Sequence, residues 1–327
     1  AAGFRKANDR QRALQTSIGI GEALAASGEF DAALRRYAVD HDEAVTAGWP
    51  VLAALCNERS ALIRLARGEF SEALQGFESA RQQYERLQMP QHLANTERQL
   101  GETYLELRLL HEASVSLQAT IARFESLEMW LEAAWTRIEF AKALAYLRAD
   151  DPRVDAELSA AEQVFAAESQ LAGQATAMLA RAEHVVQLGK PDGALELATE
   201  AAKIFHQLDM AANAARSRVV VAVCEWQHSH PRGARDTFAS LLSFAREKGL
   251  LSIELCALTH LGHIASHERD YDGARHYFER AVAIVEEQRH RLSGDDLRHA
   301  FLSSAVAPYR ELLRLAMADI LGLIDLT

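Results

Sequence analysis

Three histidines, His260, His263 and His267, have the types and spacing closest to those of a metal site in this sequence. Spaced i, i+3 and i+7, they lie near one face of a helix, and a pair four residues apart, such as His263 and His267, can chelate a metal ion. No carboxylate or cysteine stands at a matching spacing, and Glu268 follows His267 instead of lying between the histidines. We therefore expect no metal site and interpret these side chains as polar contacts or as a pH-sensitive surface.

Other patterns that could support catalysis are also weak. Cys56 and His92 could pair as nucleophile and base, but both fall in helical patterns without an oxyanion site. The Gly-Ile-Gly run at 19–21 lies inside a helical pattern, whereas a phosphate-binding loop follows a strand. With Cys224 and Cys256, the cysteines number three and sit in apolar helical patterns, which favours buried reduced thiols. We expect neither an enzyme nor a cofactor in this chain.

Composition and charge point to a helical protein that binds other proteins. The 327 residues are 49% hydrophobic but only 7% aromatic, with 6 prolines, and Ala, Leu, Glu, Arg and Gln dominate, which is typical of an all-helical chain. The formal net charge of −11 disfavours a nucleic-acid surface and suits a basic or apolar peptide better. Since no apolar run is long enough for a membrane span and the start lacks the apolar core of a signal peptide, we expect a cytoplasmic protein without membrane contact.

The elements that position these side chains repeat about every 40 residues. The stretch 258–281 places Gly262 twelve residues before Ala274, and this resembles the small-residue ladder that lets two helices of a tetratricopeptide repeat (TPR) approach closely. The same alanine recurs, with one slipped register, at Ala234, Ala194, Ala113, Ala73 and Ala33. The resemblance implies an all-α, right-handed α-solenoid of about seven long hairpins over residues 7–291.

A second periodic mark supports the long repeat. Tyr84, Phe124, Phe165 and Phe205, spaced by 40, 41 and 40 residues, are expected to pack near the end of each second helix. One inserted residue, at the turn 150–153, explains the slip. In the turns beginning at Gly28 and Gly68, glycine can adopt the left-handed conformation that ends a helix.

After His290 the pattern changes. Ser293 or Asp295 can cap a new helix, and we expect residues 295–327 to form one short and one longer capping helix. The apolar positions that predict these helices are Leu297, Phe301, Leu302, Tyr309, Leu312, Leu313 and Leu315. The apolar last residues suggest a junction to a further, C-terminal domain.

The segments 286–302 and 308–312 are similar to the stretch that closes the repeat array in bacterial CHAT-family proteins, where such repeats precede a caspase-like cysteine protease domain. The resemblance implies a region that regulates an attached or associated CHAT protease. Because the catalytic histidine and cysteine of that family belong to the protease domain, neither is carried over to this chain. Similar long repeats also occur in bacterial transcriptional regulators, so a ligand- or peptide-sensing region of such a protein is the alternative.

In TPR arrays the first helices of the hairpins line a concave groove. We align the units on the small residue at which their two helices pack closely, and this alignment predicts which polar residues face the groove. The aligned residues are Gly21, Ala61, Gly101, Ala141, Ala182, Ala222 and Gly262. The predicted partner-binding residues are Glu58, Asn95, Arg98, Glu102, Glu106, Lys142, Tyr146, Glu183, Gln187, Arg216, Trp226, His263 and His267. They describe a mostly acidic groove with aromatic anchors; ordinary solvated helix faces are the alternative interpretation. The clamp that holds a chaperone's terminal carboxylate is missing, since Ile18, Glu58, Arg98 and Ile138 occupy its positions.

Overall fold

The computed structural model describes residues 2–228, 230–290, 292, 298, 301 and 306–321, with only the backbone described for 2–8. These residues form α-helices and contain no strand. The helices are α1 (Ala2–Ala26), α2 (Phe30–Ala47), α3 (Pro50–Ala66), α4 (Phe70–Arg86), α5 (Pro90–Glu106), α6 (Leu110–Ser126), α7 (Trp130–Leu147), α8 (Arg153–Ala167), α9 (Leu171–Gln187), α10 (Pro191–Gln207), α11 (Ala211–Gln227), α12 (Pro231–Lys248), α13 (Leu251–His267), α14 (Tyr271–His290) and α16 (Ala307–Ile320).

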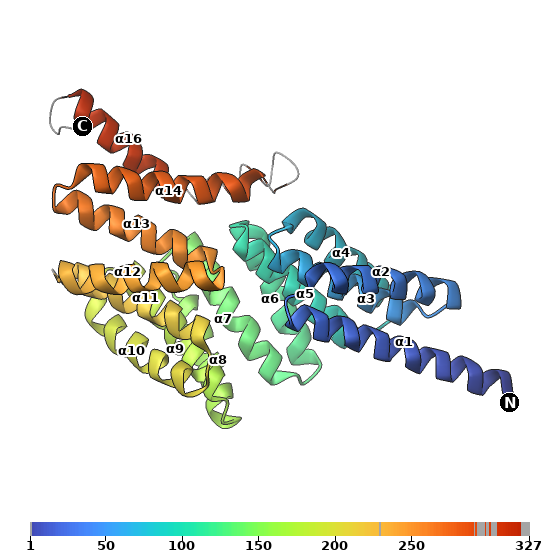
Figure 1. Ribbon diagram of the computed structural model, residues 1–327. Helices are drawn as coiled ribbons and strands as arrows, with labels where there is room; N and C mark the ends of the chain where they lie inside the picture. The colour runs from blue at the N-terminus through green and yellow to red at the C-terminus, as the bar shows by residue number, and fades with distance from the viewer. Residues whose placement is uncertain are drawn as a thin grey trace.

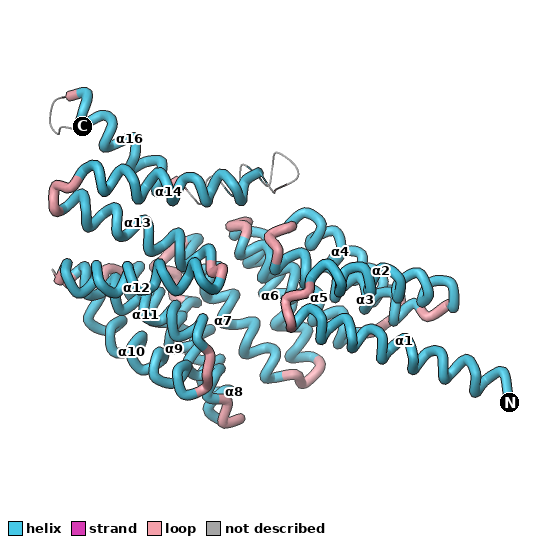
Figure 2. The backbone as a smooth tube through the Cα atoms, viewed as in Figure 1, coloured by secondary structure: helices cyan, strands magenta, loops and turns pink. Residues whose placement is uncertain are grey.

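The helices stack in chain order into a curved solenoid (Figure 1). Each helix from α1 to α13 packs against the next one along the chain, and short turns join them (Figure 2). Odd-numbered helices also contact one another, as α5 does with α7, α7 with α9, α9 with α11 and α11 with α13, whereas the described even-numbered helices from α2 to α14 make no comparable contacts with each other. The odd-numbered helices therefore form the inner wall of the curve. The predicted all-α solenoid is confirmed, while the count of seven repeats stays a prediction.

Small residues allow the helices to approach closely, as the repeat pattern predicts. Ala234 and Ala274 are completely buried, and a Cβ atom built on Gly262 would lie 2.5 Å from Cε1 of Phe278. The periodic aromatic residues Tyr84, Phe124, Phe165 and Phe205 are likewise completely buried. Because each helix pair leaves an apolar side that only its neighbour covers, these residues form a core that continues along the stack.

The turns end their preceding helices with a left-handed residue. Gly28 and Gly68 have φ angles of 82° and 73°, as the turn motif predicts. Some links between hairpins use the same conformation without glycine, since Gln88, Glu128 and Asp209 have φ angles of 53°, 57° and 56°, whereas the links after α2 and α12 use Gly48 and Gly249. At the slipped turn, Asp151 accepts a hydrogen bond from the backbone N–H of Arg153 at 3.0 Å. Hydrogen bonds from Arg153 lower the pKa of Asp151 to about 2.

At the C-terminal end, α16 packs on α14. Leu315 is buried there, and the hydroxyl of Tyr309 donates a hydrogen bond to Glu286 at 2.5 Å. Leu313, which the sequence pattern predicts to pack, is 60% exposed, because Leu312 and Leu315 occupy the side of α16 that faces α14. The predicted caps at Ser293 and Asp295 and most of the short helix after them lie outside the described residues. The domain boundaries remain predictions.

Candidate functional site

Charged residues of α5 and α7 form the first part of the inner wall. Nη1 of Arg98 lies 2.9 Å from Oε1 of Glu102, and Nζ of Lys142 lies 2.8 Å from Oε1 of Glu139. Burial raises the pKa of Glu102, and the Arg98 charge only opposes this rise. These two carboxylates are thus each paired with one cation.

Glu106 lies one turn beyond Glu102 on α5 and is exposed. Desolvation by the surrounding protein raises its pKa to about 7, and the neighbouring carboxylates of Glu102 and Glu139 add to the rise. The charge of Arg216, which belongs to α11, acts in the opposite direction. A charge on α11 thus influences a carboxylate on α5, so the inner wall curves enough to bring these two helices within electrostatic reach.

Arg216 also connects α11 with α9. Its Nη2 lies 3.6 Å from Oε1 of Glu183. Desolvation raises the pKa of Cys256, on α13, to about 12, and the Glu183 carboxylate contributes to this rise. Cys256 is therefore a protonated thiol at neutral pH and has no nucleophilic character. Predicted residues from α5, α9 and α11 thus share one electrostatic environment.

Four of the predicted residues, Lys142, Tyr146, Glu183 and Gln187, line one pocket between α7, α8 and α9. Its other lining residues are His184 and the apolar Ala141, Ala145, Val154, Leu158 and Ala180. Cζ of Arg108 lies 3.8 Å from the centre of the Tyr146 ring, which is a cation–π contact. The structure therefore brings together, in one hollow, residues that the sequence pattern placed separately on two helices.

The aromatic and histidine residues of α11 and α13 contact one another and neighbouring rings. The Trp226 and His267 rings meet edge to face at 5.3 Å, and the His263 and Phe278 rings at 5.4 Å. His260 and His263 lie 6.3 Å apart, and burial lowers the pKa of both. Within the described part of the chain, no group of three or more His, Cys, Asp or Glu residues could hold a metal ion.

The side chains of Glu58 and Asn95, two of the predicted residues, form hydrogen bonds within the solenoid. Glu58 is only 7% exposed, and its carboxylate accepts hydrogen bonds from the hydroxyls of Tyr84 at 3.1 Å and Thr96 at 3.4 Å. Nδ2 of Asn95 donates a hydrogen bond to the backbone oxygen of Gln91 at 3.1 Å. Glu58 therefore holds α3, α4 and α5 together and offers no free surface to a partner.

Sequence reasoning missed three residues of the wall: Glu139, Arg108 and His184. Glu139 stands two positions before Ala141, an offset that the register did not include. Arg108 lies in the turn after α5 and reaches Tyr146 on α7, which no helical spacing indicates. His184 occupies a core position of its helix, and a polar residue at a repeated core position was the signal that could have identified it.

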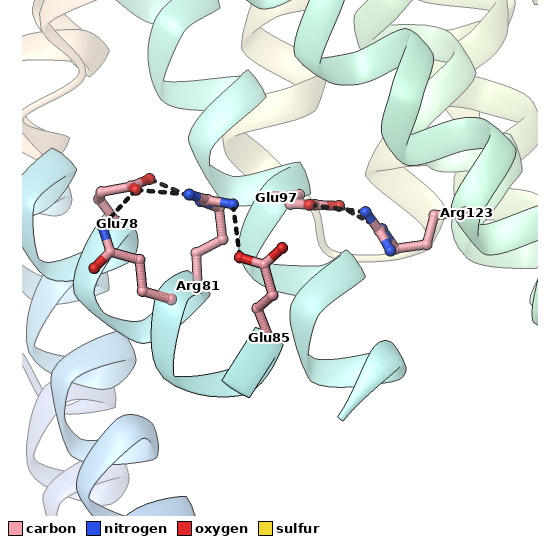
Figure 3. A network of polar contacts seen from close by, with 6 residues as sticks. Glu78, Arg81, Glu85, Glu97 and Arg123 are labelled. Carbon is pink, nitrogen blue, oxygen red and sulfur yellow. Dashed lines mark hydrogen bonds and ion pairs between the residues drawn. The ribbon is translucent and has the colours of Figure 1, made fainter. Parts of the chain in front are cut away.

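Other charges of the solenoid already have partners (Figure 3). Nη2 of Arg81 lies 2.8 Å from Oε1 of Glu78, and Nη1 of the same arginine lies 3.5 Å from Glu85. Nε of Arg123 lies 2.7 Å from Oε2 of Glu97, which links α6 to α5. The hydrogen bond from Arg81 lowers the pKa of Glu78, whereas Glu106 shows the opposite shift.

No helix among the described residues is long and apolar enough to cross a membrane. No family model matches the sequence, and no curated protein matches it.

Solved structures with the same architecture do match. A Rap protein complexed with competence and sporulation factor has a TM-score of 0.60 and 13% identity over 94% of this chain and 98% of its own. Aspartyl phosphate phosphatase F from Bacillus subtilis has a TM-score of 0.67 and 13% identity over 84% of this chain and 73% of its own. The Rap conjugation gene regulator of the plasmid pLS20, in complex with the Phr* peptide, has a TM-score of 0.58 and 12% identity over 93% of this chain and 97% of its own. At these identities the comparison establishes the fold: this chain is a TPR-like helical solenoid similar to those of Rap proteins.

Proposed function

We propose that the inner wall of the solenoid, between α5 and α13, binds a peptide or an extended segment of a partner protein, so that the chain acts as a protein-interaction module. Among the similar solved structures, the pLS20 regulator is a complex with the Phr* peptide, and the Rap protein is a complex with competence and sporulation factor. A curved stack suits this role because its concave side offers a long surface built from many helices.

The observation that carries this proposal is the state of Glu106. Among the described residues it forms no ion pair within 4 Å, and its pKa is raised to about 7 by desolvation and by two neighbouring carboxylates. A carboxylate beside two others gains from an opposite charge, because a cation offsets the repulsion between them. We therefore propose that the partner carries a lysine or arginine that binds beside Glu106.

The wall also offers aromatic anchors to an apolar side chain. Tyr146 is 40% exposed and is held in place by Arg108, and Trp226 is partly exposed beside His267. Large aromatic side chains dominate the energetics of many interfaces because they bury much apolar area at a low entropic cost. The proposed ligand is therefore a short segment with basic and apolar residues.

Two finer assignments rest on the sequence alone. The segments 286–302 and 308–312 support regulation of a CHAT-type cysteine protease, in which a partner that prefers one curvature of the solenoid shifts the population of active protease. A ligand-sensing region of a bacterial transcriptional regulator is the alternative, and we propose a cytoplasmic location for either. The codons that follow Thr327 in the gene distinguish them: a caspase-like histidine and cysteine pair supports the protease, and a helix-turn-helix supports the regulator.

The binding proposal is tested by selecting heptapeptides from a random display library on the immobilised chain and measuring their affinities by fluorescence anisotropy. We expect selected peptides to be enriched in Lys and Arg. Glu106→Gln should weaken them about tenfold, which corresponds to the loss of one charge-assisted contact. Glu196→Gln is the matched control, because Glu196 is exposed on α10, outside the inner wall, and should leave the affinity unchanged. Recovery of no peptides, or equal losses in both variants, would contradict the proposal.

A further inference from the structure

One core position of the odd-numbered helices is occupied by a histidine in a single unit. The equivalent residues, spaced by 40 or 41, are Ile63, Thr103, Ala143, His184, Cys224 and Ile264, and all are buried. His184 is 4% exposed. Among the equivalents only Thr103 carries a side-chain oxygen, and its hydroxyl donates a hydrogen bond to the backbone oxygen of Gln99 at 2.7 Å. A buried imidazole costs free energy unless its nitrogens are hydrogen-bonded in the same way.

Nδ1 of His184 is buried and has no hydrogen-bond partner among the described residues. Two other histidines, one directly after α11 and one on α13, satisfy the same atom locally. Nδ1 of His228 lies 2.7 Å from the backbone oxygen of Cys224, and Nδ1 of His260 lies 3.0 Å from that of Cys256, in each case four residues back. His184 does not make this contact, so its Nδ1 is left for a group that comes from elsewhere.

A hydrogen-bonding partner for His184 could bind in the pocket of the inner wall. His184 lines it together with Ala141 and Val154 on the apolar side and Lys142 and Glu183 on the polar side. The enclosed space admits about one water-sized group, so a single hydroxyl group fits in it but a whole carboxylate, amide or aromatic ring does not.

The charges around the pocket also favour a neutral occupant. Lys142 pairs with Glu139 at 2.8 Å, and Glu183 pairs with Arg216 at 3.6 Å, so the rim carries no unbalanced charge. Burial lowers the pKa of His184, which keeps the imidazole uncharged at neutral pH. A neutral imidazole can both donate and accept a hydrogen bond through its two nitrogens, as a hydroxyl group can.

We propose that this pocket is a subsite for a serine or threonine of the bound peptide, whose hydroxyl forms a hydrogen bond with the imidazole of His184. This inference rests on the proposed peptide binding and adds a sequence requirement to it: a small hydroxylated residue near the basic residue that binds beside Glu106.

The test uses a heptapeptide selected on the wild-type chain and synthesised with Thr, Val or Ala at the position where selection favours Ser or Thr. We expect the Thr→Val peptide, which keeps the shape and removes the hydroxyl, to bind the wild type about tenfold more weakly. In His184→Ile, which installs the residue found at 63 and 264, Thr and Val peptides should bind equally well. Thermal unfolding of this variant checks that the substitution leaves the fold intact, as the equivalent isoleucines suggest.

The outcomes separate the subsite from the proposed function. If no peptide is selected, the proposed function itself fails. If peptides are selected for Lys and Arg but show no Ser or Thr preference, peptide binding stands, and the subsite is overturned in favour of a bound water at His184. Equal Thr→Val losses in both chains would also overturn it. Should His184→Ile not fold, the ¹⁵N resonances of the His184 ring in the wild type decide: they should shift differently with the Thr and Val peptides, and identical shifts would refute the contact.

Discussion

Two glycines of α1, Gly19 and Gly21, provide a matched pair that tests the close packing on which the solenoid depends. A Cβ atom on Gly21 would lie 2.5 Å from Cε1 and 2.8 Å from Cζ of Tyr37, whereas a Cβ atom on Gly19 would meet nothing within 4 Å. Tyr37 is 1% exposed, so its ring has no free space to move into. Gly21→Ala therefore requires the two helices to separate, and Gly19→Ala does not.

The magnitudes follow from helix propensity and overpacking. Alanine in place of either glycine stabilises the helix by about 0.5–1 kcal/mol, because it restricts the unfolded chain. At Gly21 the added carbon lies about 1 Å inside the usual contact distance of carbon atoms, and overpacking of this kind costs about 1–3 kcal/mol. The propensity gain is common to both variants, so Gly21→Ala should be less stable than Gly19→Ala by about 1–3 kcal/mol.

Native-state hydrogen exchange is the suitable assay, because terminal units of a solenoid can open without the rest. Amides of α1 and α2 should exchange faster in Gly21→Ala and slower in Gly19→Ala than in the wild type. Amides of α9 to α12 should exchange at wild-type rates in both variants and act as the internal reference. Equal protection of α1 and α2 in the two variants would refute the claim that a small residue is required at this contact.

Three further predictions concern the groove and its support. Because only ionised Glu106 attracts a cation and its pKa is about 7, a basic peptide should bind about fivefold more tightly at pH 8 than at pH 6, and Glu106→Gln should flatten this profile in anisotropy titrations. Tyr84→Phe removes the 3.1 Å hydrogen bond to buried Glu58 and should lower the free energy of unfolding by about 1–3 kcal/mol in urea titrations; an unchanged midpoint would contradict this account. Trp226→Ala should weaken the selected peptides tenfold or more, measured by calorimetry, and an unaltered affinity would remove this residue from the binding surface.

The sequence by itself determined the solenoid because its packing is local. A helix pair contacts only its neighbours, so a residue type that recurs every 40 positions identifies a contact that recurs in space. Gly28 and Gly68 end their helices as predicted, and Tyr84 and Phe124 are buried as predicted. The same reasoning placed Lys142, Tyr146, Glu183 and Gln187 on the inner wall, where they line one pocket, although their role in binding stays a proposal.

Only the tertiary structure decided which polar groups act on one another. Glu58 and Arg98 hold the same register position, yet Glu58 is buried because the Tyr84 hydroxyl binds it, whereas Arg98 is partly exposed and pairs with Glu102. The effect of Arg216 on Glu106, which lies three odd-numbered helices away, depends on the curvature accumulated over the intervening units. Spacing along the chain fixes which face of a helix a residue occupies. The charges that lie near this face depend on the curvature accumulated over the intervening units, and the repeat pattern of the sequence does not specify that curvature.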